Sequence, residues 1–272
     1  MRRIETFSAF KINDKENFGF SPETYSRLKF GSLSAARHFG ESLAQGFIHH
    51  FGNLLTDRQI VVLPSAYSHI RTASCIMKDF FVNRLNLFLF DHNCPPVEES
   101  KISRTVTYRE DYGEMTAEQR YNLIKGDKFH VDKSFMDNKK LIFIDDIKIT
   151  GTHERIITKM LDDFDIQNDC FMLYLAELQN DSVHPNIENY LNHFCVKGLD
   201  NLDEIIKTGD FIFNTRVVKY ILNSDYNQCK VFLARQDKSF INDLFYLAIG
   251  NSYGKFLEYR KNLEYIRNIV IV

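Results

Sequence analysis

The sequence predicts an α/β fold in which a central parallel sheet carries helical additions at both ends of the chain. Short apolar runs at 60–63, 141–144 and 171–176 indicate buried strands, and helical spacing separates them. Helical spacing also dominates residues 1–58 and 185–272. Strands that alternate with helices form parallel sheets, and ligands bind at the carboxyl ends of such strands.

We therefore expect three parts in the chain. Residues 1–58 form a helical N-terminal segment packed on the core, residues 59–184 form the α/β core, and residues 185–272 form a helical C-terminal region. The 272 residues are 44% hydrophobic and 26% charged, enough to bury a full core. The formal net charge of −2 argues against a nucleic-acid or membrane partner. No apolar run approaches the roughly 20 residues of a membrane span, so we expect a soluble cytoplasmic protein. The five scattered cysteines predict reduced thiols.

The opening segment is expected to be all helical. Ser21, Pro22 and Glu23 form a helix start, because serine caps the first turn, proline presets φ and glutamate favours the positive end of the helix dipole. Apolar residues then recur every three or four positions over 33–55, which predicts a second helix with one apolar face.

The first strand, 60–63, ends at Pro64, which lacks an N–H for the sheet. Residues 64–69 then predict a loop, and helical spacing over 71–85 predicts a helix. A second strand is expected at 87–90.

The most informative segment follows the strand at 141–144 and starts with the paired acids Asp145 and Asp146. Adjacent carboxylates suit the two hydroxyls of a ribose, and Thr150, Gly151 and Thr152 approach a helix N-terminus, which favours phosphate. The acid pair alone is equally compatible with a helix cap or a turn. Receiver domains keep their acid pair near the N-terminus and haloacid-dehalogenase phosphatases need Asp-x-Asp, so neither class explains Thr-Gly-Thr.

This segment resembles the motif for 5-phosphoribosyl pyrophosphate (PRPP) of the type I phosphoribosyltransferases, in which a buried strand and paired acids precede Thr-Gly-x-Thr. The resemblance covers about a dozen residues. Three positions depart from the family pattern. Lys148 and Ile149 replace a hydrophobic and a small residue, and His153 replaces a threonine.

The resemblance implies transfer of a phosphoribosyl group from PRPP to an unidentified, nucleobase-like acceptor, with release of pyrophosphate. Asp145 and Asp146 would hold the ribose as catalytic residues and bind Mg²⁺ through water or ribose hydroxyls. The implied partners are PRPP and a small-molecule acceptor, with a homodimer as a candidate assembly. The implied 5′-phosphate loop consists of Ile149, Thr150, Gly151, Thr152 and His153.

In the family, a loop after an earlier strand binds pyrophosphate through backbone N–H groups. Its counterparts here are Ser65, Ala66, Tyr67, Ser68, His69 and Arg71. An ordinary strand-to-helix turn explains these residues equally well in isolation, but their position relative to the acid pair favours binding. His69, His92 and His130 lack zinc-site spacing, and only His69 lies in a predicted site loop.

The charged excursion at 91–112 occupies the place of the family's flexible catalytic loop, which closes over PRPP. Arg104 and Arg109 are the cations that it would bring to the diphosphate, although charged loop residues are commonly just solvated. A strand at 102–108 and a short helix opened by a capping box at 116–119 are expected beside it.

A narrower resemblance, to phosphoribosyltransferase-like proteins of bacterial tellurite-type stress gene clusters, rests on 113–132 and on Lys29-Phe30-Gly31. It implies a specialised nucleotide-like biosynthetic role in a stress response. Two alternatives remain open: a regulator that binds PRPP or a nucleotide without catalysis, and a sugar-phosphate hydrolase. Pyrophosphate release that depends on an acceptor would distinguish the transferase from both.

Overall fold

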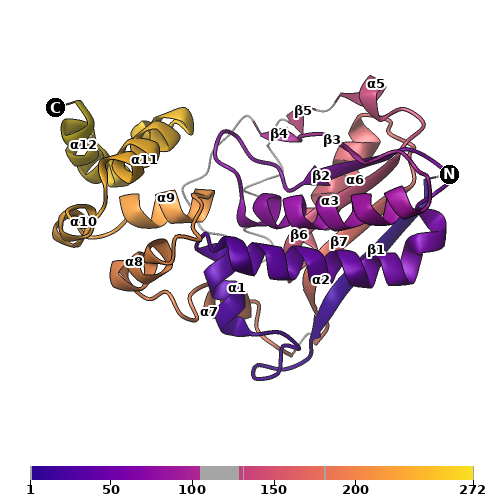
Figure 1. The fold of residues 1–272 in the computed structure, drawn as a ribbon, viewed down its shortest axis with the longest axis horizontal. Coiled ribbons are helices and arrows are strands. Elements are labelled where there is room, and N and C mark those ends of the chain that lie inside the picture. Colours follow the sequence, from indigo (N-terminus) through magenta and orange to yellow (C-terminus); the bar gives the residue numbers. More distant parts are fainter. Residues whose placement is uncertain (1, 105–128, 131, 181, 272) are drawn as a thin grey trace.

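A computed structural model describes residues 2–104, 129–130, 132–180 and 182–271. Within these residues a five-stranded sheet has the order β1-β7-β6-β2-β3, with every neighbouring pair parallel (Figure 1). The predicted parallel α/β fold is therefore confirmed. The strands of this sheet are β1 (Ile4–Ile12), β2 (Ile60–Pro64), β3 (Glu98–Glu99), β6 (Lys140–Lys148) and β7 (Cys170–Leu178).

Helices cover both faces of the sheet. One face packs against α2 (Leu33–Phe51) and α3 (Ala73–Asp91), which run side by side in Figure 1, and the other packs against α6 (Thr152–Asp163). A Cβ atom on Gly40 would lie 2.4 Å from the carbonyl oxygen of Met77, so glycine permits the close approach of α2 to α3. This arrangement buries β6 and β7 on both faces, which explains their nearly continuous apolar sequence.

The expectation that the opening segment is all helical is wrong for its first part. Residues Ile4–Ile12 form β1, the edge strand beside β7. The strand forms through hydrogen bonds to a partner distant in sequence, and its charged residues at the sheet edge hide the strand pattern. The predicted helix start is confirmed, because the Ser21 side chain accepts a hydrogen bond of 3.2 Å from Thr24 N and caps α1 (Pro22–Lys29).

The strand expected at 87–90 is also wrong, because these residues continue α3. Leu85 and Leu89 are buried four positions apart on the inner face of the helix, whereas Leu87 and Phe90 point outward and are 50% and 77% exposed. The helix ends only where Asn93 takes a positive φ of 55°. The apolar residues at 87–90, at the end of the helix, therefore have a sequence pattern that is also typical of a short strand.

The C-terminal region is helical, as predicted, and has a core of its own. Buried aromatic residues such as Phe232, Phe240 and Tyr259 belong to this core, apart from the two cores beside the sheet. Figure 1 shows most of these helices grouped at one side of the α/β part, whereas the first of them, Ile187–Asn192, lies beside α1 and buries Ile187 and Leu191 in the core of α2 and α3. The helices are α7 (Ile187–Asn192), α8 (Leu199–Lys207), α9 (Thr215–Leu222), α10 (Tyr226–Leu233), α11 (Lys238–Gly250), η3 (Tyr253–Lys255) and α12 (Leu257–Ile271).

Short elements complete the described structure. The remaining elements are η1 (Gly52–Leu54), the antiparallel pair β4 (Ser103–Arg104) and β5 (Phe129–His130), and α5 (Lys133–Met136). The described helices include none that is long and apolar enough to cross a membrane. All five cysteines are free thiols, as predicted, and three of them are buried.

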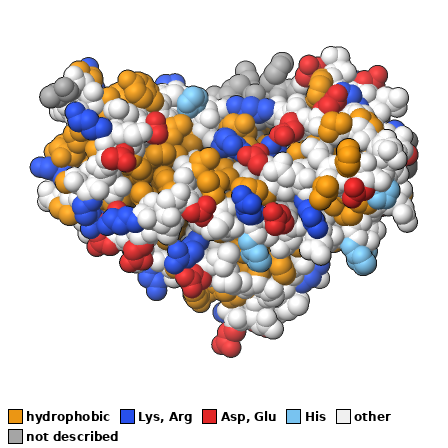
Figure 2. Space-filling view, in the orientation of Figure 1, with side chains coloured by type: hydrophobic (Ala, Val, Ile, Leu, Met, Phe, Trp, Pro, Cys, Tyr) orange, Lys and Arg blue, Asp and Glu red, His pale blue; other side chains and the backbone are white. Residues whose placement is uncertain are grey.

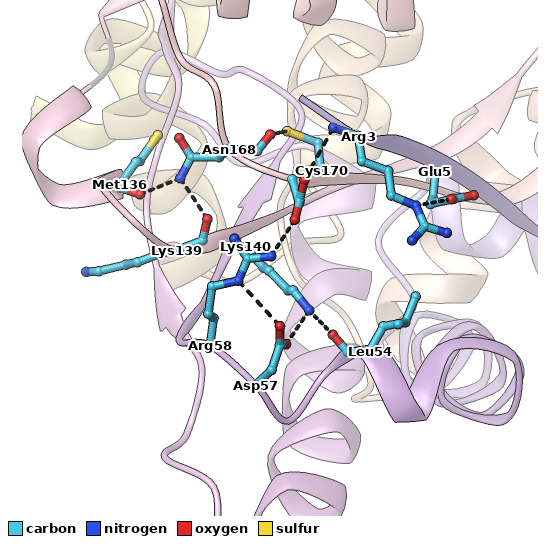
Figure 3. Close-up of polar contacts among 11 residues, drawn as sticks. Arg3, Glu5, Leu54, Asp57, Arg58, Met136, Lys139, Lys140, Asn168 and Cys170 are labelled. Atoms are coloured by element: carbon cyan, nitrogen blue, oxygen red, sulfur yellow. Dashed lines mark hydrogen bonds and ion pairs between the residues drawn. The ribbon is translucent and has the colours of Figure 1, made fainter. Parts of the chain in front are cut away.

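Ion pairs join the amino ends of the strands. Lys140, at the start of β6, donates to the carbonyl of Leu54 and to the carboxylate of Asp57 (Figure 3). Arg58 pairs with Asp169, just before β7, and Asp169 accepts a hydrogen bond of 3.3 Å from Arg3 N. We call Asp57, Arg58, Lys140 and Asp169 the amino-edge cluster.

Candidate functional site

The loop after β2 contacts the last part of β6 at the carboxyl edge of the sheet. Ser65 N donates to the carbonyl of Ile144 over 3.1 Å, and Ser65 Oγ donates to Asp145 Oδ1 over 2.7 Å. The two strands are neighbours in the sheet, so parallel pairing brings their carboxyl ends together. The acid pair and the loop at 64–69 therefore lie at the same edge of the sheet.

The paired acids point to opposite faces of β6, because successive side chains alternate along a strand. Asp145 lies on the α6 side, where its Oδ2 is 3.0 Å from His153 Nδ1. Asp146 is buried on the α1 side, where it accepts a hydrogen bond of 3.2 Å from the Tyr25 hydroxyl and pairs with Lys29. Asp145 and Asp146 therefore contact different neighbours on the two faces of the strand, and the expectation that both bind one ligand stays a prediction.

The surroundings of Asp145 favour its charged form. Burial by itself would raise the pKa of this carboxyl, but the neighbouring His153, the hydrogen bond from Ser65 and the more distant Lys29 hold the pKa well below its ordinary value. Asp145 is thus an ionised acceptor at neutral pH. Such a group can accept hydrogen bonds from hydroxyl groups of a ligand.

The loop after β6 leads directly into the first turn of α6. Gly151 has a φ of 65°, in the left-handed region that favours glycine, and it precedes the first residue of the helix. The hydroxyls of Thr150 and Thr152 lie 2.8 Å apart, and Arg155 Nη2 donates to Thr152 Oγ1 over 3.1 Å. Two hydroxyls, a guanidinium and the N-terminus of a three-turn helix therefore converge on this loop.

Lys148, one of the departures from the family pattern, balances acidic neighbours. Its Nζ is 2.8 Å from Glu154 Oε2 and 3.0 Å from Glu177 Oε1. Burial opposes ionisation of Glu177, but hydrogen bonds from Lys11 and Lys148 outweigh it and lower its pKa to about 2. Lys148 also neutralises Glu154, whose carboxylate would otherwise weaken anion binding at the first turn of α6.

The other predicted site residues have varied surroundings. Arg71 pairs with Asp79 of α3 and donates to the carbonyl of Cys75 over 3.0 Å, so its charge is already balanced. Lys101 Nζ lies 4.1 Å from the centre of the Tyr67 ring and donates to the carbonyl of Ser68.

Among the remaining predicted residues, Ala66 is buried, and Ile149 packs beside the core that contains α2 and α3. The backbone of Arg104 pairs with that of Phe129 in the short antiparallel ladder. Arg109 and the predicted helix at 116–126 lie outside the described residues. His92 is at the surface, with Nδ1 2.8 Å from the carbonyl of Phe88.

Sequence reasoning missed the cation and the hydroxyl that contact Asp146. Lys29 and Tyr25 come from α1, more than a hundred residues earlier in the chain. Lys29 stood out only as part of the Lys29-Phe30-Gly31 resemblance, which gave no partner for its charge. Among the residues that the structure describes, no three His, Cys, Asp or Glu side chains form a ready metal cluster.

Comparison with known proteins places the chain in a family. The model of the family described as PRTase ComF-like matches residues 4–266, nearly the whole chain. The chain therefore belongs to the PRTase ComF-like family. No curated protein matches it.

Solved structures similar to the chain are distant in sequence. A hypoxanthine phosphoribosyltransferase from Staphylococcus aureus, in orthorhombic and tetragonal crystals, is 12% identical over 53% of this chain and 69% or 75% of that chain, with a TM-score of 0.34 in each form. A hypoxanthine-guanine phosphoribosyltransferase from L. donovani is 13% identical over 57% of this chain and 74% of that chain, with a TM-score of 0.32.

Proposed function

We propose that this protein binds PRPP and transfers its phosphoribosyl group to a small-molecule acceptor, with release of pyrophosphate. One observation carries the proposal. The ionised Asp145 lies between Ser65 of the loop after β2 and His153 at the start of α6, so both predicted phosphate loops adjoin one carboxylate. Membership in the PRTase ComF-like family supports the same class of ligand.

In this proposal each part of the carboxyl edge has a separate task. Asp145 accepts hydrogen bonds from the ribose hydroxyls, replacing its present contacts with Ser65 and His153. The 5′-phosphate binds to the loop at 149–153, where Thr150, Thr152 and the first N–H groups of α6 supply donors. Backbone N–H groups of residues 66–68 bind the pyrophosphate.

The ionised carboxylate of Asp145 and the oxygens of PRPP are suitable ligands for Mg²⁺. A hard cation prefers oxygen ligands and keeps several waters, so Asp145 and the substrate's own oxygens suffice without a cluster of protein ligands. When bound, Mg²⁺ would neutralise charge on the leaving pyrophosphate. Asp146 has a less direct task here, because Lys29 already balances its carboxylate.

In the proposed reaction, these contacts hold the substrate while it is displaced at C1′. The bond from C1′ to the pyrophosphate oxygen breaks with both electrons leaving on pyrophosphate, and an acceptor nitrogen forms the new bond to C1′. The acceptor's proton passes to solvent. Asp145 contributes by holding the ribose in line for attack, and the two phosphate sites fix the ends of the molecule.

The direct test is Asp145→Asn, which keeps the size of the side chain and removes its charge. We expect calorimetry to show about 10- to 100-fold weaker binding of PRPP with Mg²⁺, the typical loss for a charge-assisted hydrogen bond. Asp57→Asn, in the amino-edge cluster, is the matched control and should bind normally. Equal affinity of Asp145→Asn and wild type would refute the ribose role.

A PRPP-binding regulator remains the second candidate, because Lys148, Ile149 and His153 depart from the family pattern. Incubation of wild type with PRPP, Mg²⁺ and a panel of nucleobases distinguishes the candidates. Pyrophosphate release that requires an acceptor supports the transferase. Binding without turnover across the panel supports the regulator, and phosphate release without acceptor supports a hydrolase.

A further inference from the structure

Asn251, beyond the end of α11, holds the backbone of the loop after β2. Its Oδ1 accepts hydrogen bonds from His69 N over 3.0 Å and from Ile70 N over 3.1 Å. Asn251 is only 3% exposed; its bond to Ile70 N is buried and its bond to His69 N is partly buried. One buried side-chain oxygen from the C-terminal region therefore fixes two consecutive N–H groups of this loop.

Thr215, the first residue of α9, holds the carbonyl groups of the same loop. Its Oγ1 lies 3.0 Å from the carbonyl oxygen of Ile70 and 3.1 Å from that of Arg71, and its N–H donates to Arg71 over 2.9 Å. The loop's last residues are thus bonded to the C-terminal helices through both their N–H and their C=O groups.

The two ends of the loop after β2 pack into different cores. Ile70 is 2% exposed and belongs to the core of the C-terminal helices, whereas Ala66 belongs to a core beside the sheet. Ser65, at the start of the loop, is bonded to Asp145. The loop therefore spans two cores, and its conformation depends on how the C-terminal helices hold its far end.

We propose that the C-terminal helical region positions the pyrophosphate loop, with Asn251 as the main positioning residue and Thr215 as its complement. This inference rests on the proposed function, because it assigns a task to the loop at 65–71. Backbone N–H groups bind a diphosphate tightly only when they are already oriented, since ordering a loose loop on binding costs free energy. The helices would thus act on substrate affinity without contacting substrate.

The test uses Asn251→Leu, which removes the acceptor at similar volume, and Asn251→Asp, which keeps it. We expect Asn251→Leu to weaken binding of Mg²⁺-pyrophosphate and of PRPP with Mg²⁺ about tenfold. Ribose 5-phosphate, which depends on the loop at 149–153, should bind as in wild type. Asn251→Asp buries a charge and should lose stability. Its carboxylate still accepts both hydrogen bonds, so it should bind pyrophosphate more tightly than Asn251→Leu does.

Asn262→Leu is the matched control for a merely structural effect. Asn262 is also 3% exposed in the C-terminal region, but its Nδ2 donates to the carbonyls of Leu222 and Ser224, far from the loop in sequence. This variant should lose stability and keep its affinity for pyrophosphate. Should Asn251→Leu fail to fold, Thr215→Val removes the other side-chain contacts and carries the same expectation.

Hydrogen exchange of the His69 and Ile70 amides gives a readout independent of any ligand. Both should exchange faster in Asn251→Leu than in wild type. Pyrophosphate affinity unchanged in Asn251→Leu, or equal losses for pyrophosphate and ribose 5-phosphate, would overturn the positioning role. Wild type that binds neither PRPP nor pyrophosphate would instead overturn the proposed function, and this inference with it.

Discussion

The two edges of the sheet both carry ion pairs, but they bury them differently. At the carboxyl edge, the side chains of Lys29 and Asp146 are 11% and 9% exposed. In the amino-edge cluster, Lys140 is 5% exposed, but its partner Asp57 is 55% exposed (Figure 3). The Lys140–Asp57 pair thus leaves one partner in water, whereas the Lys29–Asp146 pair removes both from it.

This difference indicates what each set of charges is for. A pair with one solvated partner costs little desolvation, so it can fasten strand ends without a further role. A fully buried pair is expensive and adds little stability beyond an apolar pair of the same volume. The presence of the Lys29–Asp146 pair beside Asp145 is explained if the edge must hold charged groups ready for an anionic ligand.

Figure 2 shows Lys, Arg, Asp and Glu side chains close together on the visible surface of the α/β part.

The largest effect on stability is expected for Lys29→Met. The substitution keeps the volume of the side chain and leaves the buried Asp146 carboxylate without its cation, so we expect a loss of about 3 kcal/mol in the free energy of unfolding. Urea denaturation measures it. The double variant Lys29→Met with Asp146→Asn should recover part of the loss. A loss below about 1 kcal/mol for Lys29→Met would show that the pair is not buried in solution.

A smaller loss of stability is expected for Lys140→Met. Asp57 stays hydrated when its partner is removed, and the main loss is the hydrogen bond to the carbonyl of Leu54, so stability should fall by only about 1–2 kcal/mol. Affinity for PRPP should not change, because the site is at the other edge. A larger loss than that of Lys29→Met would reverse the contrast between the edges.

The smallest effect on stability is expected for the ion pairs of Lys148, whose side chains are partly exposed, and it should depend on pH. The pKa of Glu177 is lowered to about 2, so its pairing stabilises the fold fully above its ordinary pKa of 4.5 and loses this effect as the pH falls toward 2. Lys148→Met should therefore cost less than about 1 kcal/mol at pH 7, with the difference from wild type shrinking below pH 4.5. Melting curves from pH 7 to pH 3 measure this. A difference that is constant with pH would exclude Glu177 as its source.

The parts of the fold that sequence predicted are those with local patterns. The apolar runs at 60–63, 141–144 and 171–176 lie in β2, β6 and β7, although β6 continues through Asp145 and Asp146 to Lys148 instead of ending before them. Ser21 and Gly151 occupy the helix starts that their chemistry suits. The Asp-Asp and Thr-Gly-Thr segments also follow one another in the chain. Local order was therefore enough to locate the candidate site.

Contacts between segments that are distant in the chain could not be predicted from local sequence patterns. β1 pairs with β7, Lys29 pairs with Asp146, and Asn251 bonds to the loop after β2, each across more than a hundred residues. Asp145 and Asp146 are adjacent in the motif and point to opposite faces of β6, and the sequence pattern alone does not identify the neighbours of each. The domain boundaries and the roles of the site residues remain predictions.

The most direct measurement is a crystal structure of the protein soaked with PRPP and Mg²⁺. We predict ribose hydroxyls within hydrogen-bonding distance of Asp145, the 5′-phosphate at Thr150 to Thr152, and pyrophosphate along residues 66–68. PRPP bound elsewhere, or loops at Ser65 and Gly151 that stay empty at saturating ligand, would contradict the proposed site.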